Sequence, residues 1–134
     1  MDVVQAKELI WYEACESGGV VLTLRMGDDP GVERMRKLLL ALKIVFDDLH
    51  EATAIDRPLA YALHALAVYP ESQASAWSRQ GRTWRTHLIA DEIPAVALAA
   101  ESIFAGEWQD LSDEPGPAGT SACLKAIEPE PPPS

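Results

Sequence analysis

The sequence predicts a mainly α-helical, single-domain bundle of four or five helices with one short strand or hairpin element and a disordered C-terminal tail. Apolar residues recur three and four apart in several segments, glycine and proline separate these segments, and six of the ten prolines lie from residue 109 onward. A chain of 134 residues with a hydrophobic fraction of 48% suits one domain with one core. We therefore expect a helical domain over residues 1–108 and an acidic, proline-rich tail over residues 109–134.

The best-patterned helix spans residues 32–51. Its apolar side chains alternate at intervals of three and four, which keeps them on one stripe that must face a core. This stripe consists of Val32, Met35, Leu39, Leu42, Phe46 and Leu49. Its start is marked by Asp28, Asp29, Pro30 and Gly31, because an acidic residue can cap free N–H groups and proline suits the first helical position.

Two segments come before this helix. Residues 2–17 predict a helix with Asp2 as its N-terminal cap. Residues 20–26 are mostly β-branched or apolar and lie between glycines, which predicts a strand. A strand needs a partner for its backbone groups. The candidate partner strand in this chain is residues 82–89, whose alternating pattern fits a strand but which could equally be helical.

A second apolar helix is expected after Asp56 and Pro58, with Pro70 as its end. Between Leu59 and Tyr69 the only distinctly polar residue is His64. This helix is therefore expected to be the most buried element, with His64 as a core histidine bonded to a backbone carbonyl.

The last part of the domain is expected to hold two more helices, a short polar one over residues 71–80 and a final one over residues 91–106. The core face of the final helix is expected to comprise Val96, Ala99, Ala100, Ile103 and Phe104. Trp108 is expected to fold back on its end. Within the tail, residues 122–127 form a short apolar island that suits docking to a partner or packing on the domain.

The charge distribution favours a basic protein as partner. The net charge is −10, from 11 Lys and Arg against 21 Asp and Glu, which argues against a nucleic-acid binder. The acidity is concentrated toward the two ends of the chain, as expected for an electric field directed at something basic.

Location and redox state follow from what the chain lacks. No apolar run is long enough to span a bilayer and the N-terminus does not resemble a signal peptide, so we expect no membrane partner and a cytoplasmic location. Cys15 and Cys123 lie far apart without a CxxC spacing. We interpret both as free thiols.

Leu40 and Ile44 mark a candidate partner-binding surface. They lie four apart on the side of the 32–51 helix opposite its main stripe. Either the N-terminal segment covers them, or they contact a partner, which includes a second copy of the chain in a homodimer. The full candidate surface consists of Leu40, Lys43, Ile44, Asp47, Asp48 and Glu51.

A metal site is one alternative. Asp47 and His50 are three apart and share a helix face, as carboxylate and imidazole ligands do in metal-binding bundles. His87 and Asp91 could complete such a site. A di-metal bundle needs this motif twice, however, and the chain has no second DxxH or ExxH.

A second alternative is a nucleic-acid-associated regulator that uses the basic patch. This patch comprises Arg79, Arg82, Trp84 and Arg85. Arginines with aromatic residues can hold phosphates and stack on bases. Because the net charge is negative, we rank three roles for this patch in order. Internal pairing with the acidic first or last helix comes first, binding to an acidic partner second, and binding to nucleic acid third.

No catalytic or cofactor-binding motif is present. The chain lacks a P-loop, GxGxxG, GxSxG and HExxH, so we assign no catalytic residue and no cofactor. The leading hypothesis is a small acidic protein-binding module: an inhibitor, an immunity-type protein or a chaperone-like partner of a more basic protein.

Overall fold

The computed structural model describes residues 1–109, which fold into five α helices and a π-helical turn, so the mainly helical prediction is confirmed. These elements are α1 (Val3–Cys15), α2 (Val20–Arg25), α3 (Val32–Leu49), α4 (Arg57–Arg79), η1 (Leu88–Glu92) and α5 (Ile93–Ala105). The predicted tail lies outside the described residues, except for Gln109. Within residues 1–109 no helix has both the length and the apolar character needed to cross a membrane.

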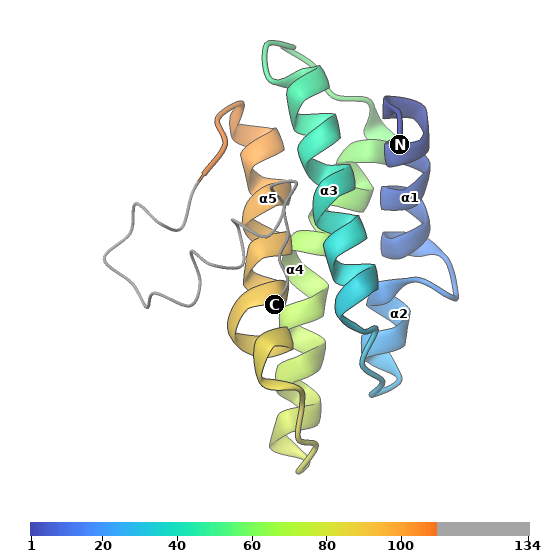
Figure 1. Cartoon of the computed structure of the whole chain (residues 1–134), viewed down its shortest axis with the longest axis vertical. Coiled ribbons are helices and arrows are strands. Elements are labelled where there is room, and N and C mark those ends of the chain that lie inside the picture. The colour runs from blue at the N-terminus through green and yellow to red at the C-terminus, as the bar shows by residue number, and fades with distance from the viewer. Residues whose placement is uncertain (110–134) are drawn as a thin grey trace.

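The four long helices form a ring around one core. α1 packs against α3 and α4, and α5 packs against the same two helices from the other side. Figure 1 shows α3 in front, α4 behind it, α1 at the right and α5 at the left. α3 and α4 are therefore diagonal neighbours, and α2 packs against α4 below α1. The core is filled mainly by aliphatic side chains, among them Ile10, Leu38, Leu42, Leu63, Leu66, Leu88 and Ile93.

The predicted strand over residues 20–26 is wrong, because this segment forms the six-residue helix α2. The part of the chain that the structure describes contains no strand at all. A helix bonds its own backbone groups, whereas a strand here would have no partner. The N–H of Val20 donates to the buried carboxylate of Glu13 at 2.9 Å, and Leu24 is buried in the core. Residues 82–85 are not helical, and the helical path resumes at Thr86.

The expected break at Pro70 is also wrong, since α4 is 23 residues long and continues through Pro70 to Arg79. Proline inside a helix removes one backbone hydrogen bond and costs about 3 kcal/mol. Pro70 is buried, and α4 packs against α1, α2 and α5 along its length. This packing offsets the local cost. The start is as predicted: Asp56 accepts a hydrogen bond from the N–H of Leu59 at 3.3 Å.

α4 is not buried all round, contrary to expectation. Tyr61 and Val68 are exposed on its outer side, and His64 is exposed as well, so it is not a core histidine. The His64 ring lies 6.3 Å from the ring of Tyr69, centroid to centroid. The outer side of α4 is exposed because of the ring arrangement. α1 and α5 cover the flanks of α4, and α3 lies across the core from it, so the side of α4 that faces away from α3 is left uncovered.

The end of the described chain folds back as expected. Gly106 ends α5 in the left-handed region with φ 78°, and Trp108 packs edge-on against Phe46, 5.3 Å between ring centroids. The N–H of Gln109 donates to the Oγ of buried Ser102 at 2.9 Å. One residue of the predicted core face differs, because Phe104 is 48% exposed.

The starts of α1 and α3, for which the sequence predicts acidic caps, behave differently. Asp2 caps α1, accepting from the N–H of Gln5 at 2.8 Å while the Gln5 side chain accepts from the N–H of Asp2. At α3 the N-cap is Gly31, with φ 93° and no side-chain cap. Asp29 instead accepts from the N–H of Gly31 and pairs with Arg85, which lies 56 residues later in the chain.

Candidate functional site

The outer face of α3 carries the predicted partner-binding residues, but offers little apolar surface. Leu40 is 41% exposed, whereas Ile44 is half-buried and packs against the core. Lys43 Nζ lies 3.2 Å from Asp47 Oδ1, and it also sits above the ring of Phe46. α1 packs beside α3 without burying Leu40. The face therefore presents one exposed apolar side chain beside the Lys43–Asp47 ion pair.

The remaining members of this predicted surface lie at the C-terminal end of α3. Asp48 Oδ2 is 4.0 Å from Lys7 Nζ of α1. Glu51 Oε2 is 3.6 Å from His50 Nε2. These contacts are exposed and each contributes about 0 to 1 kcal/mol. They position acidic groups at the surface without excluding a partner.

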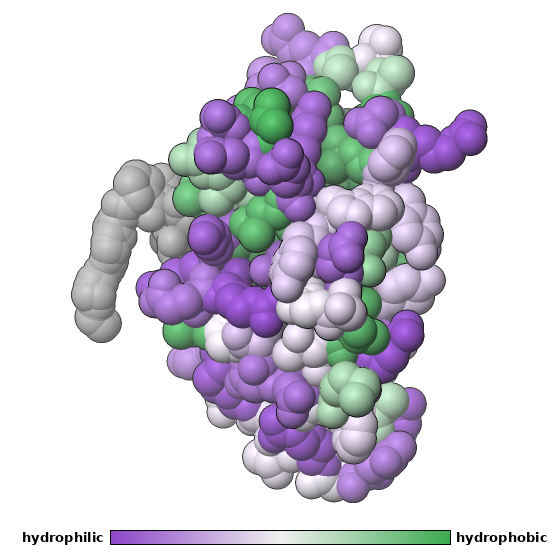
Figure 2. All heavy atoms as spheres, turned by 90° about the vertical axis from the view of Figure 1, so that its right-hand side faces the viewer, coloured by the Kyte–Doolittle hydropathy of each residue, from purple (hydrophilic) through white to green (hydrophobic). Residues whose placement is uncertain are grey.

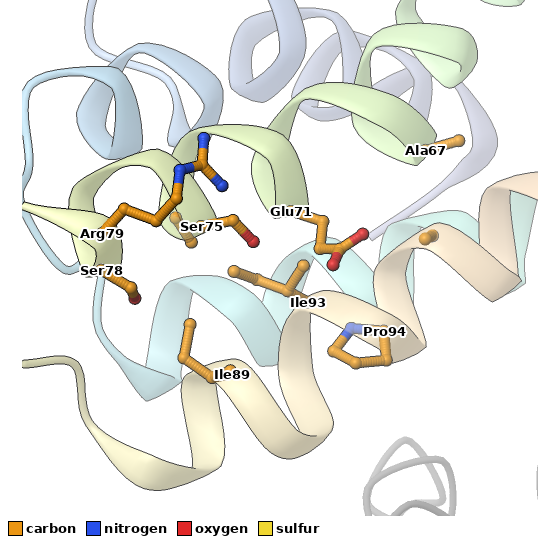
Figure 3. A pocket seen from close by; sticks show the side chains of 10 residues that line it. Ala67, Glu71, Ser75, Ser78, Arg79, Ile89, Ile93 and Pro94 are labelled. Carbon is orange, nitrogen blue, oxygen red and sulfur yellow. The ribbon is translucent and has the colours of Figure 1, made fainter.

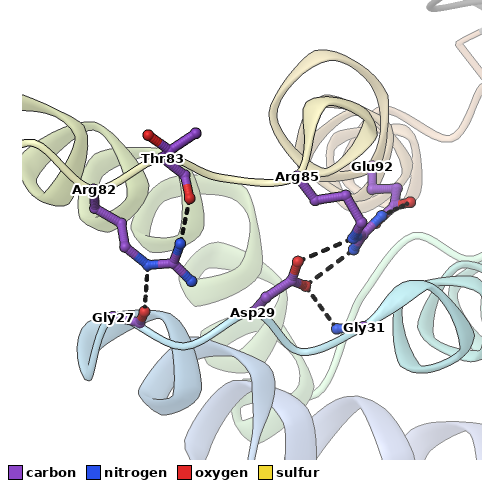
Figure 4. A network of polar contacts seen from close by, with 7 residues as sticks. All are labelled: Gly27, Asp29, Gly31, Arg82, Thr83, Arg85 and Glu92. Atoms are coloured by element: carbon purple, nitrogen blue, oxygen red, sulfur yellow. Dashed lines mark hydrogen bonds and ion pairs between the residues drawn. The ribbon is translucent and has the colours of Figure 1, made fainter.

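Arg85 of the predicted basic patch is used inside the domain (Figure 4). Its Nε donates to Asp29 Oδ2 at 2.9 Å, and its NH1 donates to Glu92 Oε2 at 2.6 Å. The hydrogen bonds from Arg85 lower the pKa of Asp29, and partial burial opposes them. The bonds to Glu92 first, and to Asp29 second, raise the pKa of Arg85. Its charge is thus neutralised by two carboxylates.

Arg82 completes this clamp between the α2–α3 loop and the segment after α4 (Figure 4), and Trp84 packs beside it. Arg82 Nε donates to the carbonyl of Gly27 at 2.9 Å, and its guanidinium also donates to the carbonyl of Thr83. The guanidinium carbon lies 4.2 Å from the centre of the Trp84 ring. Trp84 is buried, and its Nε1 donates to the carbonyl of Ala74 at 3.1 Å. These contacts give Arg82 and Trp84 a structural role within the domain.

The four metal candidates are not brought together. His87 Nδ1 pairs with Asp91 Oδ2 at 2.6 Å near η1, while His50 Nδ1 lies 3.2 Å from the carbonyl oxygen of Asp47 on α3. Among residues 1–109 no group of three or more His, Cys, Asp or Glu side chains could hold a metal ion.

An exposed surface that sequence reasoning missed lies across α1 and α4, and we call it the aromatic band. Its members are exposed by 36% to 64%: Val4, Trp11 and Tyr12 from α1, and Tyr61, Val68 and Tyr69 from α4. The rings of Trp11 and Tyr61 lie 6.4 Å apart, which joins the two halves. Figure 2 views the α1 side, where large pale side chains cross the middle of the face.

Acidic groups surround the aromatic band. A cavity of about 290 Å³ beside Trp11 is lined by Glu8 and Asp56 as well as Lys7 and apolar side chains. Trp11 Nε1 donates to Glu16 Oε2 at 3.2 Å. A cationic side chain could therefore contact both an aromatic ring and carboxylates here.

Sequence patterns could not reveal this band because its members belong to different helices. The pattern of residues 2–17 does not mark Trp11 as exposed, and the apolar second helix assigns Tyr61 and Val68 to the core. Exposure depends on which sides of α1 and α4 other helices cover. The available signal was an excess of apolar positions on the predicted 57–69 helix over what one stripe requires.

A groove of about 600 Å³ lies between α4 and the η1–α5 segment (Figure 3). Small and apolar side chains line it, including Ala67, Ala74, Ser75, Ser78, Ile89, Ile93, Pro94 and Ala97. Glu71 and Arg79 of α4 add one charge of each sign. Arg79 is the one member of the predicted basic patch on this side.

Cys15, on α1, has no disulfide partner within residues 1–109, and Cys123 lies outside the described residues. Burial, followed by the nearby charge of Glu16, raises the pKa of Cys15. The thiol is therefore protonated at neutral pH and a poor nucleophile.

No protein-family model, curated protein or solved structure matches the chain. We therefore infer function from the chemistry of these surfaces.

Proposed function

We propose that this protein is a protein-binding module for a partner more basic than itself, and that the aromatic band is its principal contact surface. The observation that supports this proposal is the exposure of six large apolar or aromatic side chains on two neighbouring helices. Aromatic side chains are enriched in interfaces because they bury much area and lose little conformational freedom. Left in water, the band lowers solubility; covered by a partner, it stabilises a complex.

The sign of the partner's charge follows from the surroundings of the band. The chain carries a net charge of −10, and Glu8, Glu16 and Asp56 lie beside the exposed rings. Such a field accelerates association with a basic surface and repels an acidic one. An inhibitor, an immunity-type protein and a chaperone-like protein would all use such a surface, and the identity of the partner distinguishes them.

The aromatic band supports this role better than the α3 face does. On α3, Ile44 is half-buried against the core and Leu40 stands alone among paired charges. The centre of an interface is normally apolar and depleted in charge. Trp11 and Tyr61 provide two neighbouring aromatic rings for such a centre, with carboxylates at its edge, whereas Leu40 is a single side chain.

The proposal is tested by affinity capture from a lysate of the source organism, with a low-salt wash and a high-salt elution. The main partner should be basic and should elute with salt, because screening weakens the attraction. Its affinity for purified variants is then measured. Tyr61→Asp should weaken binding about tenfold or more, as expected for an aromatic residue near an interface centre.

Leu40→Asp is the matched control, since it places the same new charge at another exposed apolar position. It should change the affinity less than about threefold. Circular dichroism verifies that both variants fold. The proposal is wrong if no basic, salt-sensitive partner is captured, or if Leu40→Asp weakens binding more than Tyr61→Asp.

A further inference from the structure

The groove between α4 and η1–α5 has a charge arrangement that is symmetric about one small residue. Glu71 and Arg79 lie four residues before and four residues after Ser75 on α4, and all three line the groove. Figure 3 shows them along one helix, opposite Ile89, Ile93 and Pro94. The spacing of eight residues corresponds to about 12 Å along the helix axis.

Neither charge is satisfied within the part of the chain that the structure describes. The ion pairs of residues 1–109 involve neither Glu71 nor Arg79. Arg82 and Arg85, in contrast, donate to oxygen atoms of the protein itself. Both Glu71 and Arg79 are exposed, so their charges are available to another molecule.

We propose that this groove is a self-association surface, in which a second copy of the chain packs against α4 in antiparallel orientation about a two-fold axis near Ser75. A two-fold axis at that position brings Glu71 of each copy opposite Arg79 of the other, so two ion pairs form across the interface. An interface of this kind must be complementary to itself. The alternation of acidic, small and basic residues at equal spacing meets this requirement.

The side chains between the two charges suit close helix contact. Ser75 and Ser78 are small, which lets a second helix approach α4 without a steric clash. Ile89, 42% exposed at the rim of the groove, adds apolar area that a second copy would cover. Trp11 and Tyr61 do not line the groove, so each copy keeps this pair of aromatic rings available to another protein.

The net charge opposes this association and sets the conditions for its test. Two chains of charge −10 repel each other, and at about 0.15 M salt this repulsion is screened beyond about 8 Å. Contact ion pairs at the interface are screened much less. The dimer is therefore examined at physiological ionic strength.

The test is sedimentation equilibrium of the full chain at about 0.15 M salt, from about 5 to 500 μM. The wild type should dimerise reversibly with concentration. Glu71→Arg and Arg79→Glu should each weaken the dimer about tenfold or more, since like charges then face each other. The double variant, Glu71→Arg with Arg79→Glu, should restore the dimer to within about threefold, because the exchanged charges are complementary again.

Glu33→Arg is the control for Glu71→Arg. Glu33 is exposed on α3, and its substitution reduces the net negative charge by the same amount. It should leave the dimer unchanged or slightly stronger. A wild type that stays monomeric, a dimer indifferent to both single variants, or a double variant that fails to restore association would each overturn the proposal. None of these results bears on capture of a basic partner by the aromatic band.

Discussion

Single residues of this chain are explained by partners far away in the sequence. Arg34 lies near the N-terminus of α3, where a positive charge opposes the helix dipole. Its NH2 donates to Glu13 Oε1 at 2.5 Å and to the carbonyl of Gly18 at 2.7 Å. Glu13 is buried and also accepts from the N–H of Val20. One ion pair thus joins α1, α2 and α3, and a bonded charge outweighs an unfavourable dipole term of about 0.3 to 1 kcal/mol.

The pairing of Asp29 with Arg85 predicts a pH dependence of stability. The hydrogen bonds from Arg85 hold the pKa of Asp29 below its ordinary value. The ionised carboxylate therefore stabilises the fold above its unfolded-state pKa of about 3.9, and this contribution is lost as the pH falls through the lower folded-state pKa. Asp29→Asn should be destabilised relative to the wild type near neutral pH, with a difference that shrinks below about pH 4.

Urea unfolding of both proteins between about pH 3 and 7 measures this difference. Asp47→Asn serves as a control, because the Lys43–Asp47 pair is exposed and its loss should change the free energy of unfolding by less than about 1 kcal/mol. A wild-type advantage that stays constant down to pH 3 would show that Asp29 does not titrate as described.

Among the helices, tertiary packing overrides local preference in both directions. The residues of α2 favour a strand, yet they form a helix because Glu13 bonds its first N–H and because Val20, Val21 and Leu24 reach the core. Pro70 favours a break, yet α4 continues because the proline is buried between packed helices. α5 shows the role of size: Ala99 and Ala100 are fully buried, which lets α3 and α4 approach it closely.

The same substitution at two positions of α5 should therefore affect stability to different extents. Ala99→Leu adds bulk to a filled core and should destabilise the protein by about 1 to 3 kcal/mol. Ala97 lines the groove, so Ala97→Leu should change the free energy of unfolding by less than about 0.5 kcal/mol. Chemical denaturation compares the two. An equal loss at both positions would mean that the groove is not open.

For the molecule as a whole, the dominant feature is excess negative charge. Residues 1–109 alone hold 10 Lys and Arg against 16 Asp and Glu. Folding brings these charges closer than they are in the unfolded chain, so repulsion opposes the compact state. The structure neutralises some of them at Glu13, Asp29 and Glu92, and leaves others around the aromatic band.

Stability should therefore rise with moderate salt. Between about 0.01 and 0.15 M NaCl the Debye length falls from about 30 to about 8 Å, which screens repulsion between distant carboxylates more than the short internal ion pairs. Thermal unfolding at both salt concentrations measures the change in midpoint. Replacing exposed Glu33 and Glu101 by glutamine should reduce this salt effect. A lower midpoint in the higher salt would contradict the expectation.

The sequence by itself determined the features that depend on neighbours along the chain. The apolar spacing of α3, the caps at Asp2 and Asp56 and the stop at Gly106 are local, because a helix bonds residues four apart and is capped by its adjacent side chains. Of the candidate sites, the sequence located Leu40 and the basic patch, but not their surroundings.

Only the tertiary structure decided which polar groups meet and which apolar groups stay in water. Arg85 lies 56 residues from Asp29, and Trp11 and Tyr61 come from different helices. No periodic pattern relates such residues, since their contacts arise when helices pack around a shared core. For the same reason, the surface proposed to bind a partner became visible on α1 and α4, where the ring of helices leaves one side of each uncovered.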